Sequence, residues 1–234
     1  MINLISDNKL IFIAVILAVI AIIAFLSYYY SIKQIVLRRL SKTPRKSRSG
    51  FKPNEFLKVS GKALHVKEPL IAPMSKRKCI FYSIKIEKKV NNGKSSHWKT
   101  ILKEEKIQEF FIDSNGELII VRPKEDPRNF ISYLVKDHKL NSGFLNDPTP
   151  DFESYLRQHG ISSTNILGLN KSIRYQEGIV EIGEKITVAG IAKWKNLSEP
   201  IADYPYSRIA ELESSEGRKL IITDLPQAAV VKNS

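Results

Sequence analysis

Residues 10–30 read LIFIAVILAVIAIIAFLSYYY and contain no charged side chain. At about 1.5 Å of rise per residue, a helix over this stretch reaches roughly 31 Å, enough to cross the hydrocarbon core of a bilayer. A helix also bonds every backbone amide internally, as that layer requires. The three closing tyrosines suit the headgroup level. We therefore expect a transmembrane helix over 10–30, after a short extracytoplasmic N-terminal segment, 1–9.

Two other interpretations of the apolar run fit less well. The apolar core of a cleaved signal peptide is shorter, about 7–15 residues, and is followed by a small-residue cleavage site. This run is longer, ends in tyrosines and leads into basic sequence. A buried core helix would show a polar face, which the run lacks.

The charges flanking the apolar run predict its orientation. Only Asp7 and Lys9 precede it, and no acidic residue follows it before Glu55. The positive-inside rule then places the N-terminus outside and the rest of the chain in the cytoplasm, as a single-pass protein of a plasma or inner membrane. The positive residues that carry this prediction are Lys33, Arg38, Arg39, Lys42, Arg45, Lys46 and Arg48.

We interpret residues 31–52 as a basic juxtamembrane linker. It can act as a topology signal, or attract anionic lipid by about 1 kcal/mol per Lys or Arg near the surface. Its part SKTPRKSRSG, 41–50, is typical of a flexible tether. The formal net charge is +13, and the linker supplies more than half of it. The overall basicity is therefore no argument for nucleic-acid binding.

Beyond the linker the patterns are mostly those of β-structure. Apolar residues alternate over 80–86, Asn91–Gly93 is a hairpin turn signal, and a return strand is expected over 98–106. The runs 110–112 and 118–121 flank a second hairpin turn, and 130–135 is a strand or short helix. Two further strands are expected over 173–180 and 186–192, joined by a turn at 181–184. A third hairpin is expected, in which 209–212 and 220–222 flank a turn at 214–217.

One helix is expected after Thr149, which can cap it. Pro150 suits the first turn, and Gly160 ends the helix. His159 is then a helix-end residue rather than a ligand. Together the patterns predict a β-rich α+β fold, in which one compact antiparallel barrel or sandwich-like domain, 53–230, contains one or two helices and precedes a tail, 231–234.

Three blocks of this domain resemble the GIDE domain, also called BAM for "beside a membrane". They are APMSKRKCIFY (72–82, after VSGKA at 59–63), FFIDSNGELIIVRP (110–123) and RYQEGIVEIGEKITVAG (174–190). The order of the blocks agrees with the family. The motif residues, which we expect to be structural first, are Gly61, Pro73, Ser75, Cys79, Tyr82, Gly116, Arg174, Glu177, Gly183 and Gly190. We read the four glycines as devices for turns or close approach. A buried Glu177 would need a donor, for which Arg174 is the local candidate.

The family contains organelle-membrane E3 ubiquitin ligases, whose separate zinc-binding RING carries the transfer chemistry, and prokaryotic membrane proteins. This chain has a single cysteine, Cys79, and four scattered histidines. A RING needs several thiolates, so the resemblance does not bring the ligase activity with it. We expect no catalytic residue, no metal site and no cofactor.

Weaker chemical signals have structural explanations. Cys79 could be a nucleophile if Lys76, Arg77 and Lys78 stabilised its thiolate, but the alternation places it inside on a strand. Asp147, Asp151 and Glu153 lack calcium-loop spacing and suit turn and cap positions. Val59–Lys62 ends like a P-loop, but Phe56 stands where that motif needs glycine.

The predicted function is a membrane-tethered interaction module without catalysis of its own, which binds the bilayer and a protein or membrane-associated partner. One alternative is the E3 ligase-like activity implied by the family. The other is a single-strand nucleic-acid-binding β domain, for which Trp98 and Trp194, each beside lysines, are the candidate stacking residues. Strand-end aromatics beside a core explain the tryptophans better, so we expect no nucleic-acid partner.

Overall fold

The structure is a computed structural model that describes residues 2–123, 129–143, 146–165, 167–197 and 207–230, with side chains from Ile11 onward. The expected tail, 231–234, lies outside the described residues.

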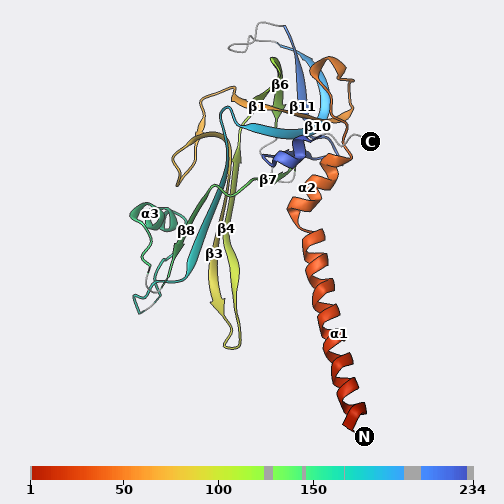
Figure 1. Ribbon diagram of the computed structural model, residues 1–234. Coiled ribbons are helices and arrows are strands. Elements are labelled where there is room, and N and C mark those ends of the chain that lie inside the picture. Colours follow the sequence, from red (N-terminus) through yellow and green to blue (C-terminus); the bar gives the residue numbers. More distant parts are fainter. Residues whose placement is uncertain (1, 124–128, 144–145, 166, 198–206, 231–234) are drawn as a thin grey trace.

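The N-terminal apolar run forms α1 (Ile2–Tyr29), which projects away from the rest of the molecule (Figure 1). Its part Ile11–Tyr29 is long and apolar enough to span a membrane, and no part of that stretch is buried against the protein. The prediction of a helix that is long and apolar enough to span a membrane is confirmed.

A short second helix, α2 (Ile32–Ser41), starts directly after a break at Tyr30 and Ser31. Ser31 caps it by accepting a hydrogen bond from the Gln34 amide. Val36 and Leu40 are buried against the body of the protein, with Ala189, Ile221, Leu225 and Ala228. The first part of the predicted linker is thus an amphipathic helix that packs on the β-structure.

The flexible tether expected over 41–50 is also corrected. The Lys58 amide donates to Pro44 O at 2.8 Å and the Lys46 amide to Lys58 O at 3.2 Å, so this segment lies along a strand. A 3₁₀ turn follows at η1 (Arg48–Gly50). The Pro44 carbonyl and the Lys46 amide thus bond β1, and the Arg48 amide bonds the Glu117 side chain of the barrel, which the composition of the segment could not reveal.

Five strands close into a barrel. In order around it they are β1 (Phe56–His65), β5 (Phe110–Ser114), β6 (Glu117–Arg122), β11 (Arg208–Glu213) and β10 (Lys185–Asn196). The ring closes because β10 also pairs with β1. All neighbours are antiparallel except β6 and β11, which are parallel. This is the strand order and direction of an OB-type barrel.

Two more strands extend the barrel sheet beyond β10: β12 (Leu220–Thr223) and β7 (Phe130–Tyr133). The third expected hairpin is wrong. β11 and β12 do not pair with each other; both are antiparallel to β10, at Ile191–Asn196 and Thr187–Ala189. Because β10 is longer than β11 and longer than β12, both strands fit along the same edge of β10. The chain leaves that edge at Ser214, after β11, and returns to it with β12. The β12–β7 pair is parallel, so the barrel sheet is not purely antiparallel as predicted.

The second sheet forms an extended blade. It contains β2 (Leu70–Ile71), β3 (Lys78–Asn91), β4 (Ser96–Ile107), β9 (Ile173–Glu181) and β8 (His138–Ser142). β3 lies between β4 and β9, and β8 pairs with β9 (Figure 1). Helix α3 (Pro150–Gln158) covers one face, burying Phe152, Tyr155 and Leu156. After β12, the 3₁₀ turn η3 (Pro226–Ala229) lies beside α2.

Most local predictions are confirmed. β3–β4 and β5–β6 are the expected hairpins, and 130–135 contributes a strand. Thr149 caps α3 by accepting from the Phe152 amide, and Gly160 ends it with φ +67°. Separate apolar cores fill the two parts: Val59, Phe110 and Leu212 lie in the barrel core, and Ile84, Phe152 and Tyr175 in the blade core. The β-rich α+β class therefore holds.

Candidate functional site

Several of the predicted motif residues come together where α3 lies over the blade. Tyr82 of β3 and Glu177 of β9 join three residues that the sequence did not single out: Glu104 of β4, Tyr155 of α3 and Tyr175 of β9. We call these five residues the motif cluster. Tyr155 and Tyr175 meet edge to face, with ring centroids 5.9 Å apart.

Glu177 is fully buried, and hydrogen bonds hold its carboxylate. The amides of Met74 and Ser75 donate to it at 3.1 and 3.0 Å, and the Tyr175 hydroxyl donates at 2.6 Å. Burial alone would raise the pKa of Glu177, but the polar groups of Ser75, Tyr175 and Met74 around the carboxylate outweigh it and lower the pKa. Glu177 therefore fastens the 72–77 loop to the sheet as an ionised carboxylate.

Glu104 accepts hydrogen bonds from two buried phenols. Tyr82 Oη lies 2.7 Å from Glu104 Oε1, and Tyr155 Oη lies 2.8 Å from Glu104 Oε2. Burial, together with these bonds to a carboxylate, raises the pKa of both tyrosines. The phenols thus stay protonated donors, which suits a structural network rather than proton transfer near neutral pH.

A polar pocket of about 370 Å³ opens beside the motif cluster, and its lining includes Pro73, Lys76 and Asp151. His159 also lines it. His159 Nδ1 lies 2.9 Å from Tyr155 O, and Nε2 lies 3.5 Å from Glu104 Oε2. As predicted, His159 is the C-cap of α3.

Cys79 is buried in the blade core. Burial raises the pKa of its thiol to about 11, and Glu177 adds to the effect. The positive charges of Lys76, Arg77 and Lys78, which could have stabilised a thiolate, do not outweigh burial and the charge of Glu177. An inaccessible thiol that stays protonated does not act as a nucleophile.

The motif glycines occupy positions that a side chain would disturb. Gly116 and Gly183 sit in turns at φ +83° and +86°. A Cβ on Gly61 would lie 2.2 Å from Asp113 O on the paired strand, and one on Gly190 would lie 2.6 Å from Leu220 Cδ2. They serve turns and close approach, as the sequence predicted.

Arg174 does not bond Glu177, which corrects the expected pairing. Alternate residues of a strand face opposite sides, so Arg174 points to the open face of the blade. There its Nε lies 2.5 Å from Glu87 Oε2, and its guanidinium lies over the Trp98 ring, 4.3 Å from the centroid. Lys85 also pairs with Glu87, at 2.6 Å.

Both tryptophan rings are in contact with arginines. The Arg174 guanidinium lies over the Trp98 ring, and those of Arg208 and Arg48 lie 4.9 and 5.8 Å from the centroid of the Trp194 ring. A guanidinium group over an indole face competes with a nucleobase for that face.

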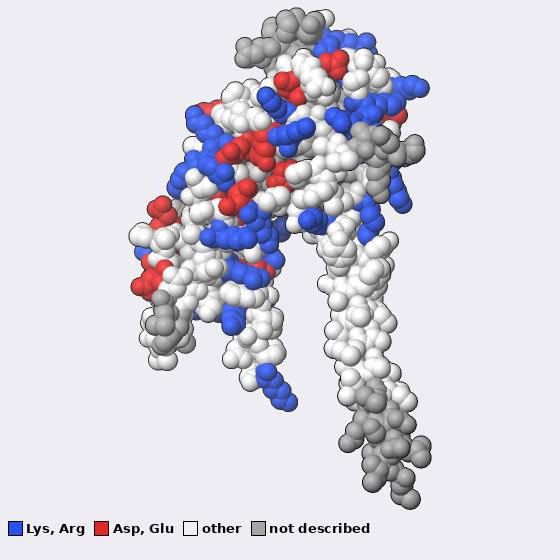
Figure 2. Space-filling view, viewed as in Figure 1, with Lys and Arg blue, Asp and Glu red and all other residues white. Residues whose placement is uncertain are grey.

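The juxtamembrane cations follow α2 and the segment after it. Lys33, Arg38 and Arg39 lie on α2, and Lys46 pairs with Glu55 at 2.6 Å. Figure 2 shows an uncharged surface along the part of α1 whose side chains the structure describes, and positive side chains where α1 meets the body. Lys42, Arg45 and Arg48 continue along the barrel.

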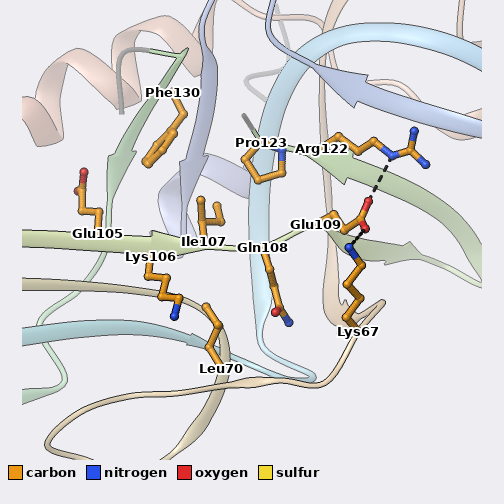
Figure 3. Close-up of a pocket in the computed structure, with 10 residues that line it drawn as sticks. All are labelled: Lys67, Leu70, Glu105, Lys106, Ile107, Gln108, Glu109, Arg122, Pro123 and Phe130. Atoms are coloured by element: carbon orange, nitrogen blue, oxygen red, sulfur yellow. Dashed lines mark ion pairs between the residues drawn. The ribbon is translucent and has the colours of Figure 1, made fainter. Parts of the chain in front are cut away.

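A further pocket, of about 610 Å³, lies at the junction of barrel and blade (Figure 3). Lys67 and Arg122 both reach Glu109, at 2.8 and 3.4 Å, and Arg122 also bonds Glu211 at 3.2 Å. Ile107 and Phe130 give the pocket an apolar wall (Figure 3). We call it the junction pocket.

The sequence did not indicate the junction pocket. Its residues come from several segments between Lys67 and Phe130, and no spacing along the chain connects them. Of the carboxylates that line it, Glu109 is paired with Lys67 and Arg122, and Glu105 with Lys103. The pocket therefore offers paired charges and an apolar wall rather than a reactive group.

Within the described ranges, no group of three or more His, Cys, Asp and Glu side chains is placed to hold a metal ion. The acidic residues considered in the sequence serve local structure instead. Asp147 accepts a hydrogen bond from Asn170, while Asp151 and Glu153 lie in the first turn of α3.

No protein-family model, no curated protein and no solved structure matches the chain. The resemblance to the GIDE/BAM family therefore stays a prediction.

Proposed function

We propose that the protein is a membrane-anchored interaction module, in which α1 spans the bilayer and holds the barrel and blade at its cytoplasmic face for a protein partner. The observation that carries the proposal is the packing of α2 on the barrel, which attaches the β-structure directly to the end of the apolar helix.

The link from α1 to α2 is also polar. Arg38 Nη1 donates to Tyr29 O at 2.6 Å, and its guanidinium lies 3.8 Å from the centre of the Tyr29 ring. A cation at the C-terminal end of a helix is favoured by the helix dipole. A β-structure held this close to the membrane meets its partner at raised local concentration, so a weak binding face suffices.

The edge strand β4 is the binding face that we propose. In the part of the chain that the structure describes, β4 pairs only with β3, and most of its residues from Ser96 to Lys106 are exposed or half-buried. An open edge can accept an added strand from a partner through backbone hydrogen bonds. The lysines on β4 also protect this edge from random pairing.

We also propose that the chain is a GIDE/BAM-like protein without ligase activity of its own. The three resembling blocks fall on β1 with β3, on β5 with β6, and on β9 with β10. Ubiquitin transfer would require a reactive centre, and Cys79 is buried with a raised pKa.

Single-stranded nucleic acid is the second candidate, because the barrel has OB-type strand order. In such barrels the second and third strands carry the binding face. Here those strands are β5 and β6, whose Phe111 and Ile120 are buried with Ile209. The covered face and the arginine-stacked tryptophans favour the protein-partner proposal.

A photo-crosslinking amino acid at Thr100 tests the binding face, with Lys62 on β1 as the exposed control position. We expect a partner linked from Thr100 and not from Lys62, with the same yield in Cys79→Ala. Equal linking from both positions would refute the β4 face. Ubiquitin transfer lost in Cys79→Ala would refute the non-enzymatic proposal.

Membrane attachment has its own test. We expect the full chain to stay with membranes after an alkaline wash. In a Cys79→Ala background, we expect a membrane-impermeant thiol reagent added from the cytoplasmic side to label Asn92→Cys at the exposed tip of the β3–β4 hairpin. Release by the wash would refute the anchor, and labelling only from the opposite side would refute the orientation.

A further inference from the structure

An apolar groove of about 420 Å³ lies on the α2 side of the barrel, between α2 and η3. Leu37 and Leu40 of α2 line one side, Ala228 and Val230 the other. We call it the juxtamembrane groove. Because α2 begins two residues after α1 ends, the groove lies close to the point where α1 would leave the bilayer.

Two cations line the groove, Arg38 and Lys58, and none of its described lining residues is acidic. Lys58 is unusual because its side chain is buried: the residue is 4 % exposed. Lys58 Nζ donates to Leu40 O at 2.8 Å, which is a neutral acceptor. A buried ammonium group without a carboxylate gains strongly from an anion.

The charge around the groove has the same sign. Arg45 lies close enough to Lys58 to lower its pKa, an effect that adds to that of burial. No acidic residue occurs between Ser31 and Asn54. The groove is thus apolar within, positive at its edge and adjacent to the proposed bilayer surface.

We propose that the juxtamembrane groove binds one anionic phospholipid, with its phosphate against Arg38 and Lys58 and the start of an acyl chain along Leu37 and Val230. This differs from diffuse attraction of a basic segment, because it assigns a defined site with an apolar wall. It rests on the proposed membrane placement of α1, but binding itself can be measured without a bilayer.

The phosphate explains features that a peptide or a second copy of the chain would not. A guanidinium and an ammonium group are the usual ligands of a phosphate. If α1 spans the bilayer, anionic lipid is the anion present at high local concentration beside the groove. The proposed ligand of the juxtamembrane groove is therefore a lipid rather than a soluble phosphate.

The test uses the full chain in a neutral detergent. It is titrated with dioctanoyl-phosphatidylglycerol, with dioctanoyl-phosphatidylcholine, and with inorganic phosphate, and retained lipid is counted by native mass spectrometry alongside thermal stability. We expect one phosphatidylglycerol retained per chain, a higher melting temperature, and neither effect from phosphatidylcholine or phosphate alone.

Three variants distinguish a defined lipid-binding site from general attraction by positive charge. Arg38→Gln should weaken phosphatidylglycerol binding by about tenfold, which corresponds to the loss of one good charged contact. Ser41→Glu places a carboxylate on the groove lining at an exposed position, so it tests the same point without disturbing the core. Arg39→Gln, exposed on the same helix but outside the lining, is the matched control and should weaken binding much less than Arg38→Gln does.

Equal losses in Arg39→Gln and Arg38→Gln would overturn the site in favour of diffuse attraction. Equal retention of phosphatidylcholine would overturn the role of the cations, and unchanged binding in Ser41→Glu would overturn the location. Failure of the alkaline-wash test would refute the membrane anchor separately, because none of these measurements needs the bilayer.

Discussion

At the scale of single residues, Glu177 shows how a buried charge is satisfied. The sequence pointed to Glu177 as structural and to Arg174 as its partner. In the structure Glu177 is indeed a buried structural residue, but its hydrogen-bond donors are the Met74 and Ser75 amides and the Tyr175 hydroxyl instead of Arg174. The 72–77 loop approaches β9 only through tertiary folding, so local sequence offered Arg174 and not the true donors.

Gly61 carries the first prediction at this scale. In Gly61→Ala the new Cβ would meet Asp113 O of the neighbouring strand at 2.2 Å, and backbone cannot move aside as a side chain can. We expect a loss of about 2 kcal/mol or more in the free energy of unfolding, measured by urea denaturation. Gly50→Ala is the control, since its nearest atoms lie 3.8 Å away. Equal stability of the two variants would contradict the close approach.

Glu184 and Asp224 carry a prediction on pH. Burial raises the pKa of Glu184 to about 7 and that of Asp224 to about 6. The folded state therefore binds more protons than the unfolded state from about pH 4 to 7, so stability falls as pH rises through that range. We expect the free energy of unfolding to drop by about 1 kcal/mol or more from pH 5 to pH 8.

The matching variant is Glu184→Gln, which should flatten this pH profile, while the exposed Glu216→Gln should leave it unchanged. Chemical denaturation at several pH values measures both. A profile as steep in Glu184→Gln as in the unmodified protein would show that Glu184 does not contribute.

At the scale of elements, α2 connects the sequence to the architecture. Its apolar positions, Val36 and Leu40, are one turn apart and cover Ile221 and Leu225. The surrounding charges predict a solvated linker instead. A short amphipathic helix gains its stability from tertiary packing rather than from its own propensity, so its surface had to be known first.

Leu40→Ala tests this docking. Removing a fully buried leucine from a helix interface costs about 2–5 kcal/mol, and here the loss should fall on the attachment of α2. We expect trypsin to cut within 42–50 at least several times faster, with the barrel still folded. Leu37→Ala, on the same helix but only half-buried, is the control. Equal cleavage rates would contradict the docking.

At the scale of the whole molecule, α1 and the β3–β4 hairpin leave the body in the same direction (Figure 1). The hairpin carries exposed charges such as Lys94 and Lys99, which cannot enter hydrocarbon at low cost. If α1 spans a bilayer, it must turn away from the hairpin. The break at Tyr30 and Ser31 is the natural pivot, because no described backbone hydrogen bond runs from a residue of α2 back to α1. The bonds that reach the end of α1 include those of the Ser31 amide to Tyr28 O and of the Arg38 side chain to Tyr29 O.

We expect the hairpin tip to stay in water when the protein is in nanodiscs. A spin label at Asn92→Cys, in a Cys79→Ala background, should be relaxed more by a water-soluble nickel complex than by oxygen. A label at Val15→Cys should show the reverse. Relaxation of the Asn92 label mainly by oxygen would contradict the pivot.

The sequence by itself determined the apolar helix, the hairpins β3–β4 and β5–β6, the capped helix α3 and the glycine positions, because each depends on neighbours within a few residues. Only the tertiary structure decided that β11 and β12 share one edge of β10, that α2 packs on the barrel, and that the motif cluster, junction pocket and juxtamembrane groove exist. Each of these joins segments far apart in the chain, and long-range contacts are set by how whole surfaces pack rather than by any local pattern.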